Sequence, residues 1–465
     1  MTATEVRTGV GFRSERGPLL ISLMMATGLV ALDSTIIATA VLTITDQLGG
    51  FAQFPWLFSI YLLAQAVTVP IYGKLADMLG RKPVMLFGIA IFALGSLLCG
   101  LATSMLALIV FRAVQGIGAG AVAPMSMTIA GDVYTVAERA KVQGYLASVW
   151  AVSSVLGPLL GGVFAEYVSW RWIFLVNLPL AALAAWMLVR HFTESTPRQS
   201  HRIDYLGAGL LAVGAGGLML ALLEGGHAWA WGSPTSLALF GGGALALIAF
   251  GLVERRAANP ILPLWIFRRR VVLASSMVSL LVGAVLLGLT SYVPTFAQGV
   301  LGAGALVAGL TVGALTMGWP LAASQAGKVY LRIGFRRTAL IGSTLGSLGA
   351  ATLLLVDADS ALLRLAVGCF IVGTGMGLVA TPTLIAAQTS ADWSERGVVT
   401  STNMFARSIG SAVGVAVFGA LVNARVGGAD HPAPEVLAPA IHVVFLAVTA
   451  MAIVMVAASA MMPRR

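Results

Sequence analysis

Charged residues, histidine and cysteine are all scarce in this chain. Only 10% of the 465 residues are Asp, Glu, Lys or Arg, whereas soluble domains carry about 25%, so charge cannot cover a globular surface. The five histidines are scattered, without the spacing of a metal site or of a nucleophile–base pair. We therefore expect no metal, no cofactor and no enzymatic reaction. Cys99 and Cys369 lie far apart in apolar runs, which predicts buried thiols and no disulfide framework.

Apolar residues, in contrast, are abundant. They make up 58% of the sequence, and the mean hydropathy is +0.93, which is far above that of soluble proteins. Fourteen apolar segments are long enough to cross a bilayer. These segments are about 18–41, 54–73, 84–102, 105–127, 141–163, 172–190, 204–223, 235–253, 272–296, 303–325, 337–355, 362–386, 398–423 and 438–460. The composition therefore predicts an all-α polytopic membrane protein.

The placement of the basic residues predicts the orientation of the chain. An even number of crossings puts both termini on one side, and most of the 28 Lys and Arg residues fall on the connections of that side. Arg171, Arg364 and Arg425 fall on the opposite connections, so both termini are predicted to be cytosolic, in a protein of the cytoplasmic membrane. The net charge of +10 therefore reflects membrane topology, and we expect no nucleic-acid partner.

An internal repeat divides the chain. The stretch GKLADMLGRKPV at 73–84 shares glycines and basic residues, at equal offsets, with GKVYLRIGFRRT at 327–338. Likewise GIGAGAVAP at 116–124 is echoed by GTGMGLVATP at 373–382, so a six-helix unit occurs twice. The expected domains are a cytosolic segment (1–17), an N-terminal six-helix bundle (18–190), a linker with two inserted transmembrane helices (191–271), a C-terminal six-helix bundle (272–460) and a cytosolic tail (461–465).

Asp33 is the most unusual residue of the first apolar segment. An ionised carboxylate in a membrane-spanning helix costs at least about 2.5 kcal/mol, so such acids usually face a bundle interior or a wet cavity and are functional. We therefore predict that Asp33 binds and releases a proton. The alternative is a polar group that only bonds a neighbouring helix, which Ser, Thr or Asn would do at lower cost.

Arg112, in the fourth apolar segment, is the second costly charge. At about 1.5 Å per residue, Asp33 lies roughly 22 Å and Arg112 roughly 18 Å from the cytosolic face. These similar depths predict that the two groups couple, directly or through water. Arg112 then favours the ionised acid and desolvation favours the protonated acid, and their balance sets when the proton binds. The alternative is a structural Arg112 that bonds backbone carbonyls.

The loop after the second apolar segment, GKLADMLGRK, predicts a cytosolic gate. Gly73 and Gly80 permit a tight turn and close helix approach, and Asp77 can accept from a helix N-terminus or from an arginine. Arg81 lies at the cytosolic lipid surface. Such a charged clasp can form in one conformation and break in another. The alternative is an ordinary basic hairpin, and the second copy has Leu331 in place of Asp77.

The fifth apolar segment contains SSVLGPLLGG, in which Gly157, Pro158 and Gly161 are close together. Small residues let helices cross closely, and proline removes a backbone hydrogen bond and bends a helix. This stretch therefore predicts a pivot between the halves.

Several motifs together resemble one family. They are LDSTIIATAV in the first segment, GKLADMLGRK, RAVQGIGAGAVAP, GPLLGG and WRWIFLVNLP. In these motifs, and in its two additional central segments, essentially the whole chain resembles the fourteen-span drug:proton antiporters of the major facilitator superfamily. The resemblance implies the major facilitator fold, with two six-helix bundles and two extra central transmembrane helices. The sequence departs from the family pattern after LDSTI, where Ala38, Thr39 and Thr43 stand and a proline is missing.

The resemblance also implies roles for individual residues. Asp33 would be the proton-coupled carboxylate and Arg112 its partner. Gly157 and Pro158 would form the antiport pivot. Asp77 and Arg81 would form the cytosolic gate.

Further candidates lie near the predicted cavity. Glu224, at the outer end of the seventh segment, is a second candidate for proton or cation contact, and the alternative is an exposed loop acid. Arg407, in the thirteenth segment, has no identified partner and argues against a strictly cation-selective pocket. Aromatic faces suit bulky apolar or cationic compounds, although each such residue could instead be ordinary packing. The predicted cavity residues are Trp56, Tyr61, Gln65, Gln115, Trp150, Tyr292, Phe296, Asn403 and Arg407.

The sequence thus predicts a proton-coupled antiporter that exports amphipathic or cationic drugs and toxic compounds across the cytoplasmic membrane by alternating access. The expected partners are a small amphipathic substrate, protons and membrane lipid, and we expect a monomer. Two other hypotheses stay open. One is an exporter dedicated to a single metabolite or lipid, and the other is a membrane sensor of the same fold that transports nothing.

Overall fold

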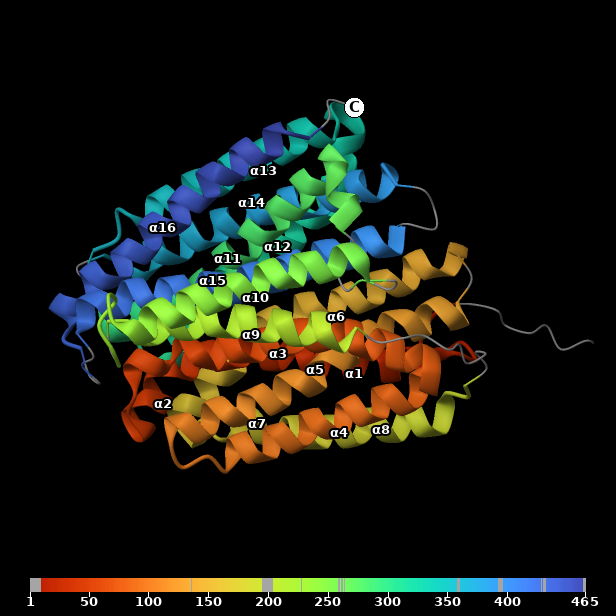
Figure 1. Ribbon diagram of the computed structural model, residues 1–465, viewed down its shortest axis with the longest axis horizontal. Helices are drawn as coiled ribbons and strands as arrows, with labels where there is room; N and C mark the ends of the chain where they lie inside the picture. The colour runs from red at the N-terminus through yellow and green to blue at the C-terminus, as the bar shows by residue number, and fades with distance from the viewer. Residues whose placement is uncertain are drawn as a thin grey trace, which may run out of the picture.

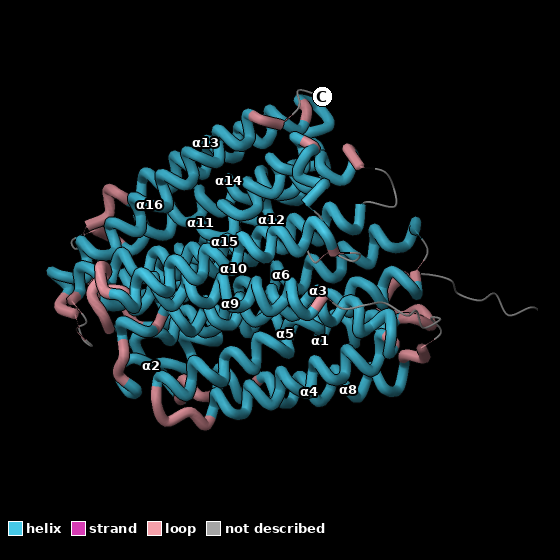
Figure 2. Tube along the Cα trace, in the orientation of Figure 1, coloured by secondary structure: helices cyan, strands magenta, loops and turns pink. Residues whose placement is uncertain are grey.

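The computed structural model describes residues 10–134, 136–194, 204–226, 228–257, 260, 262, 264–357, 360–391, 396–427, 429 and 432–462, and these are almost entirely helical (Figure 2). The α-helices are α1 (Gly17–Ile36), α2 (Val41–Leu48), α3 (Pro55–Leu79), α4 (Arg81–Gly100), α5 (Met105–Val133), α6 (Val136–Val163), α7 (Trp172–Leu175), α8 (Asn177–His191), α9 (Tyr205–Glu224), α10 (Pro234–Arg256), α11 (Arg270–Gly299), α12 (Ala305–Ile333), α13 (Phe335–Leu353), α14 (Leu362–Thr389), α15 (Arg396–Val426) and α16 (Pro434–Ala460). A 3₁₀ segment, Ile37–Ala40, joins α1 to α2.

These helices occupy the places of all fourteen predicted apolar segments. Two crossings are composite, because α1 continues through the 3₁₀ segment into α2, and α7 continues into α8. Within the described residues, 13 crossings are long and apolar enough to span a membrane. The remaining crossing, α13, has a lower hydropathy because its first turn contains Arg336 and Arg337 and its later turns contain small polar residues.

Several helices extend further than their apolar segments. The helix α5 ends at Val133 instead of near 127, and α12 ends at Ile333 instead of near 325. Hydropathy detects only the part of a helix that lies in the bilayer, whereas the backbone hydrogen bonds continue into the polar sequence beyond it.

The long helices run side by side in two halves (Figure 1). Helices α1 to α8 form the first half and α11 to α16 form the second. Helix α9 packs against α10, α3 and α15, so the inserted pair lies along the seam between the halves. Helix α1 begins and α16 ends at the same end of the molecule. We call this the basic end, because most lysines and arginines lie on its connections, and the other the opposite end.

The sequence repeat corresponds to a repeat in helix packing. Glycines of α5 contact the backbones of α3 and α4 so closely that no Cβ fits, and glycines of α14 contact α12 and α13 in the same way. These contacts join Gly116 to Tyr61, Gly118 to Phe92, Gly373 to Leu315 and Gly375 to Gly346. The two six-helix bundles therefore use the same glycine positions to pack corresponding helices.

Gly80 and Gly334 are also equivalent in the two copies. Both have a positive φ, of 103° and 87°, at the tight turns after α3 and α12. Because side chains disfavour this backbone conformation, the turn in each copy requires glycine.

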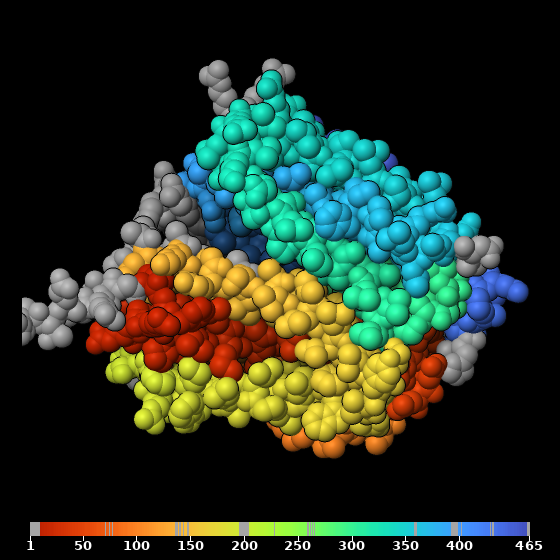
Figure 3. Space-filling view, turned by 180° about the vertical axis from the view of Figure 1, so that it is seen from behind, coloured from red at the N-terminus to blue at the C-terminus, as the bar shows by residue number. Residues whose placement is uncertain are grey.

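Hydrogen bonds join the two halves on the side of the opposite end. They run from Gln298 Nε2 to Thr39 O (3.0 Å), from Leu306 N to Glu166 Oε2 (3.0 Å), from Asn423 Nδ2 to Ala52 O (2.7 Å), from Thr316 Oγ1 to Ser154 O (2.6 Å) and from Ser59 Oγ to Ala412 O (3.1 Å). Toward the basic end the halves separate, and the surface shows a hollow between them (Figure 3). The molecule is therefore closed at the opposite end and open toward the basic end.

Candidate functional site

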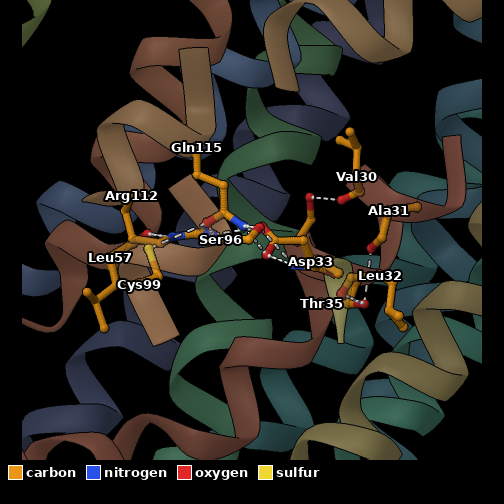
Figure 4. Close-up of polar contacts among 12 residues, drawn as sticks. Val30, Ala31, Leu32, Asp33, Thr35, Leu57, Ser96, Cys99, Arg112 and Gln115 are labelled. Atoms are coloured by element: carbon orange, nitrogen blue, oxygen red, sulfur yellow. Dashed lines mark hydrogen bonds and ion pairs between the residues drawn. The ribbon is translucent and has the colours of Figure 1, made fainter. Parts of the chain in front are cut away.

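The Asp33 carboxylate is the centre of a buried polar cluster in the first half (Figure 4). Its Oδ2 accepts a hydrogen bond from Arg112 Nη1 at 2.7 Å. Its Oδ1 accepts from Gln115 Nε2 at 2.7 Å and from Asn177 Nδ2 at 3.0 Å. Every one of these contacts donates to Asp33, so the cluster is built to hold an ionised carboxylate.

Arg112 is held from several directions. Its Nε donates to the carbonyl oxygen of Leu57 in α3 at 3.0 Å, and its Nη1 also donates to Gln115 Oε1 at 2.7 Å. The guanidinium carbon lies 4.1 Å from the ring centroid of Tyr61, in a cation–π contact. The two roles considered from the sequence, pairing with Asp33 and bonding a backbone carbonyl, therefore occur together.

Two residues of this cluster were missed by the sequence analysis. Ser96 of α4 accepts from Gln115 Nε2 at 2.7 Å and from Asn177 Nδ2 at 3.4 Å. Asn177, at the start of α8, is a polar residue in the otherwise apolar end of the motif WRWIFLVNLP. This feature of the sequence could have identified it as a candidate. For Ser96 the sequence offers no comparable signal, because serine is common in membrane helices.

Burial makes this cluster sensitive to any change in its charges. Asp33 and Asn177 are 0% exposed and Arg112 is 1% exposed. Taking two charges out of water costs several kcal/mol per ion, which the pair recovers only with good geometry and additional hydrogen bonds. Removing one partner therefore leaves an expensive charge. In the present conformation Asp33 is also closed to water, so proton exchange requires the cluster to open.

The helix that carries Asp33 changes geometry one turn later. The 3₁₀ segment Ile37–Ala40 interrupts the α-helical hydrogen-bond pattern, and mid-helix 3₁₀ stretches often mark functional hinges. This segment contacts α6 of its own half and both α11 and α12 of the other half. The hydrogen bond from Gln298 of α11 ends on Thr39 O, inside it. Asp33 thus lies about one helical turn from a backbone segment that is in contact with helices of both halves.

The predicted pivot lies against the same segment. At Gly157 and Gly161 of α6 a Cβ would overlap Thr35 and the Ile36 carbonyl oxygen, so α1 and α6 cross at backbone distance. The Pro158 carbonyl oxygen accepts from Thr39 Oγ1 at 3.3 Å. The structure therefore brings Gly157 and Gly161 to the contact of α6 with α1, and Pro158 to the contact of α6 with the 3₁₀ segment.

A methyl group at this crossing should be poorly tolerated. We expect Gly161→Ala to destabilise the protein by about 1–3 kcal/mol, because its Cβ would collide with the rigid Ile36 carbonyl oxygen. The matched control is Gly144→Ala in the same helix, where nothing lies within 4 Å of the new Cβ. Thermal unfolding of the purified proteins in detergent measures the difference. Equal melting temperatures for the two variants would contradict the close crossing.

The predicted gate residues lie near the basic ends of α3 and α4. Arg81 Nε pairs with Asp132 Oδ2 of α5 at 3.0 Å, and Asp132 was not predicted. At Gly80, a Cβ would lie 2.9 Å from the Glu194 carboxylate, which also accepts from the Lys82 backbone N–H at 2.8 Å. Nothing lies within 4 Å of a Cβ at Gly73. The Asp77 side chain lies outside the described residues.

Glu224 ends α9 and accepts a hydrogen bond from Trp56 Nε1 of α3 at 3.0 Å. This contact connects the inserted pair of helices to the first half. Glu224 is half-buried and Trp56 is buried, so the tryptophan contributes to packing between α3 and α9 in this conformation.

The other predicted cavity residues divide into buried and accessible groups. Tyr61 and Gln115 belong to the Asp33 cluster, and Tyr292 and Phe296 are 0 % exposed among aromatic neighbours. Asn403 is 6% exposed and donates to Ser275 Oγ at 2.7 Å. Gln65 is half-buried, whereas Trp150 and Arg407 are exposed.

Comparison with known proteins agrees with this architecture. The family model described as Major Facilitator Superfamily matches residues 23–415. The "Multidrug transporter protein MdtP" of Bacillus subtilis (strain 168) is 36% identical over 417 residues, which cover 90% of this chain and 77% of the relative. "Multidrug resistance protein 3" of the same strain is 37% identical over 401 residues, covering 86% and 78%.

More distant proteins share the fold. "Efflux pump dotC" of Dothistroma septosporum (strain NZE10 / CBS 128990) is 33% identical over 404 residues, covering 85% of this chain and 70% of the relative. Among solved structures, the peptide transporter POT in complex with sulfate superposes with a TM-score of 0.70 at 18% identity, covering 98% of each chain. The sequence match, the paired six-helix halves and the membrane-spanning helices lead to one conclusion: this chain belongs to the Major Facilitator Superfamily.

Proposed function

We propose that this protein is a proton-coupled antiporter that exports amphipathic drugs and other toxic compounds across the cytoplasmic membrane by alternating access. In this proposal the basic end and both termini are cytosolic, because lysine and arginine accumulate on cytosolic connections. The described conformation is then the inward-open one. The relatives named multidrug transporter and efflux pump support drugs as the exported compounds.

The observation that carries the proposal is the buried Asp33–Arg112 pair beside a segment that both halves touch. The 3₁₀ segment Ile37–Ala40 lies about one helical turn from Asp33. When the contact between the halves at this segment changes, backbone close to Asp33 therefore moves. Conversely, neutralising Asp33 weakens its hold on Arg112. The protonation state of Asp33 and the contact between the halves are therefore coupled through the same helix.

Asn177 gives the cluster a way to hold the acid in either protonation state. Its Nδ2 donates to the ionised Asp33, while its Oδ1 is buried and has no hydrogen-bond partner among the described residues. A half-turn of the amide would present that oxygen to a protonated Asp33, which donates where the ionised form accepts. In the proposed cycle this occurs when the protein is open outward and the proton enters.

The contacts that close the opposite end are suited to repeated opening. The hydrogen bonds that cross the seam are neutral, or, for the Leu306–Glu166 bond, exposed. Each such bond contributes only about 0.5–1.5 kcal/mol. Outward opening would break them while the cytosolic side closes, where Gly73, Gly80 and Arg81 form the proposed gate together with Asp132. We further propose that a monomer carries out the cycle.

Reconstituted protein tests the proposal directly. Proteoliposomes with the purified protein should accumulate a xanthene dye when a pH gradient is imposed, and an internal pH indicator should report proton movement in the opposite direction. A proton uncoupler should abolish both signals. Dye accumulation that persists with the uncoupler, or a dye that binds but is never transported, would contradict proton-coupled export.

A further inference from the structure

Arg407 is an accessible cation inside a membrane-spanning helix. Along α15, from residue 402 to residue 423, only Arg407 and Val413 are exposed. Within the described part of the chain, the Arg407 side chain has no hydrogen bond and no ion pair. A charged side chain in a membrane costs about 2.5–3.5 kcal/mol even on insertion scales, so an unpaired one is expected to have a function.

Along α15, Arg407 lies on the side that packs against α11, where its carbonyl oxygen is in close contact with Gly283. Phe418 lies about three turns further along, within about 20° of the same direction. Its ring is 6.5 Å from that of Tyr292, which is 5.3 Å from Phe54 of the first half. The face that carries Arg407 therefore packs on α11 of its own half, whereas Ala412 and Gly419, which meet the first half, point about 120–140° away from it. Val413 points about 120° away from Arg407, toward the outside of the molecule.

Toward the basic end, the space between the two halves widens into the hollow. The surface in its floor has the blue of the region around α15, and the walls are formed by the orange and green segments around α6 and α12 (Figure 3). Phe418 is buried at the closed end, whereas Arg407, nearer the basic end, is exposed. Arg407 is therefore exposed in the part of α15 that lies toward the end where the halves separate.

Trp150 supplies an aromatic surface to the same opening. In α6 it continues the row of Ser154, Pro158 and Gly162, which contact α12. Trp150 lies one turn nearer the basic end than Ser154, and its exposed fraction is 40%. An accessible tryptophan therefore lies on a helix of the wall, and an accessible arginine lies on the helix of the floor.

No described acid balances Arg407. Three described acids form ion pairs, each with another arginine: Asp33 with Arg112, Asp132 with Arg81, and Glu138 with Arg16. Glu224 accepts from Trp56, and Glu254 accepts from the Leu262 backbone N–H at 2.9 Å. Arg407 therefore contributes an accessible positive charge that no described ion pair neutralises. Such a site attracts an anion and repels a cation, more strongly than in water because the surroundings are less polar.

We propose that Arg407 binds the acidic group of the exported compound, and that the preferred substrates are amphipathic aromatic acids such as carboxylates and sulfonates. A guanidinium binds such groups with two parallel hydrogen bonds, which also orients the molecule. The aromatic part would rest on apolar and aromatic surface, including Trp150. This inference rests on the proposed export function and narrows its substrates, which the sequence predicts to be amphipathic or cationic drugs, to amphipathic acids.

Two dyes that share a xanthene ring test the inference, namely fluorescein, which is anionic at pH 7.5, and rhodamine 123, which is cationic. Equilibrium binding to the full-length protein in lipid nanodiscs, followed by fluorescence anisotropy, should give a lower Kd for fluorescein. We expect Arg407→Gln to raise the fluorescein Kd at least tenfold, about 1.4 kcal/mol, without raising that of rhodamine 123. Arg407→Lys should retain most of the fluorescein affinity.

The control is Arg425→Ala, because Arg425 is exposed at the other end of the same helix. It should leave both affinities unchanged. Tighter binding of rhodamine 123 than of fluorescein by the unmodified protein, or a fluorescein Kd that stays within threefold in Arg407→Gln, would overturn the inference. A separate measurement tests export. If the export function is wrong, neither dye is transported when a pH gradient is imposed, whichever dye binds more tightly.

Discussion

Replacing Asp33 by Asn is expected to abolish proton-driven export and also to lower the stability of the protein. Asparagine has nearly the same shape as aspartate but cannot take up a proton at neutral pH. Its new NH₂ group would meet donors of the cluster, but Asn177 can turn its unpartnered Oδ1 to accept from it. One remaining donor, Gln115 Nε2 or Arg112 Nη1, still faces the new NH₂ group, and Arg112 stays buried without its counter-ion. Because an unpaired buried charge typically costs about 3–5 kcal/mol, transport must be compared at equal amounts of folded protein.

We expect dye accumulation driven by a pH gradient to fall at least a hundredfold in Asp33→Asn proteoliposomes. Dye binding in nanodiscs should change by less than threefold, because Asp33 is 0% exposed in this conformation and cannot contact a bound dye. Asp33→Glu is the matched variant that retains a titratable group. If Asp33→Asn still coupled dye export to the pH gradient, the proton site would have to be elsewhere.

Replacing Arg112 by Leu is expected to give the largest loss of stability. The substitution removes the guanidinium that pairs with Asp33 at 2.7 Å and leaves a carboxylate in a site that water does not reach. Breaking a buried ion pair by removing one partner typically costs about 3–5 kcal/mol. Thermal unfolding in detergent should show this loss at pH 7.5. The loss should be smaller in acid, because protonating Asp33 removes the unpaired charge.

The double variant Asp33→Asn with Arg112→Leu separates charge from packing. With both charges absent, most of the lost stability should return, since the penalty arises from one unbalanced ion. Transport should remain absent in both variants. If the double variant were as unstable as Arg112→Leu alone, the loss would come from the contacts of Arg112 with Leu57 and Tyr61 and not from the unpaired acid.

Much of the architecture was predictable, because the properties that determine it are local. A run of about 20 apolar residues crosses a bilayer wherever it occurs, which is why all fourteen segments were placed correctly. The repeat was visible because close helix packing requires glycine at set positions, as Gly116 and Gly373 show. Asp33 and Arg112 were recognisable because a charge in a membrane-spanning segment has a high free-energy cost and is usually present for a function.

Side-chain contacts between helices could not be predicted in the same way. Asp132 was not expected to pair with Arg81, since a charge near a helix end is ordinary in sequence. Tyr292 and Arg407 have comparable positions as polar groups in apolar segments, yet Tyr292 is 0% exposed and Arg407 is accessible. Which of them meets the hollow depends on the angle between the halves, and hydropathy carries no information about that angle.

The sequence by itself therefore determined that the chain crosses the membrane repeatedly, that it contains two related bundles, and that Asp33 and Arg112 need partners. These conclusions follow from the free-energy cost of placing polar groups in hydrocarbon. That cost depends on the sequence of each segment and not on its neighbours. The tertiary structure decided that Ser96 and Asn177 complete the cluster and that Arg407 stays unpaired in the described hollow. Those outcomes depend on distances between helices far apart in the chain, which are set only when the bundles pack.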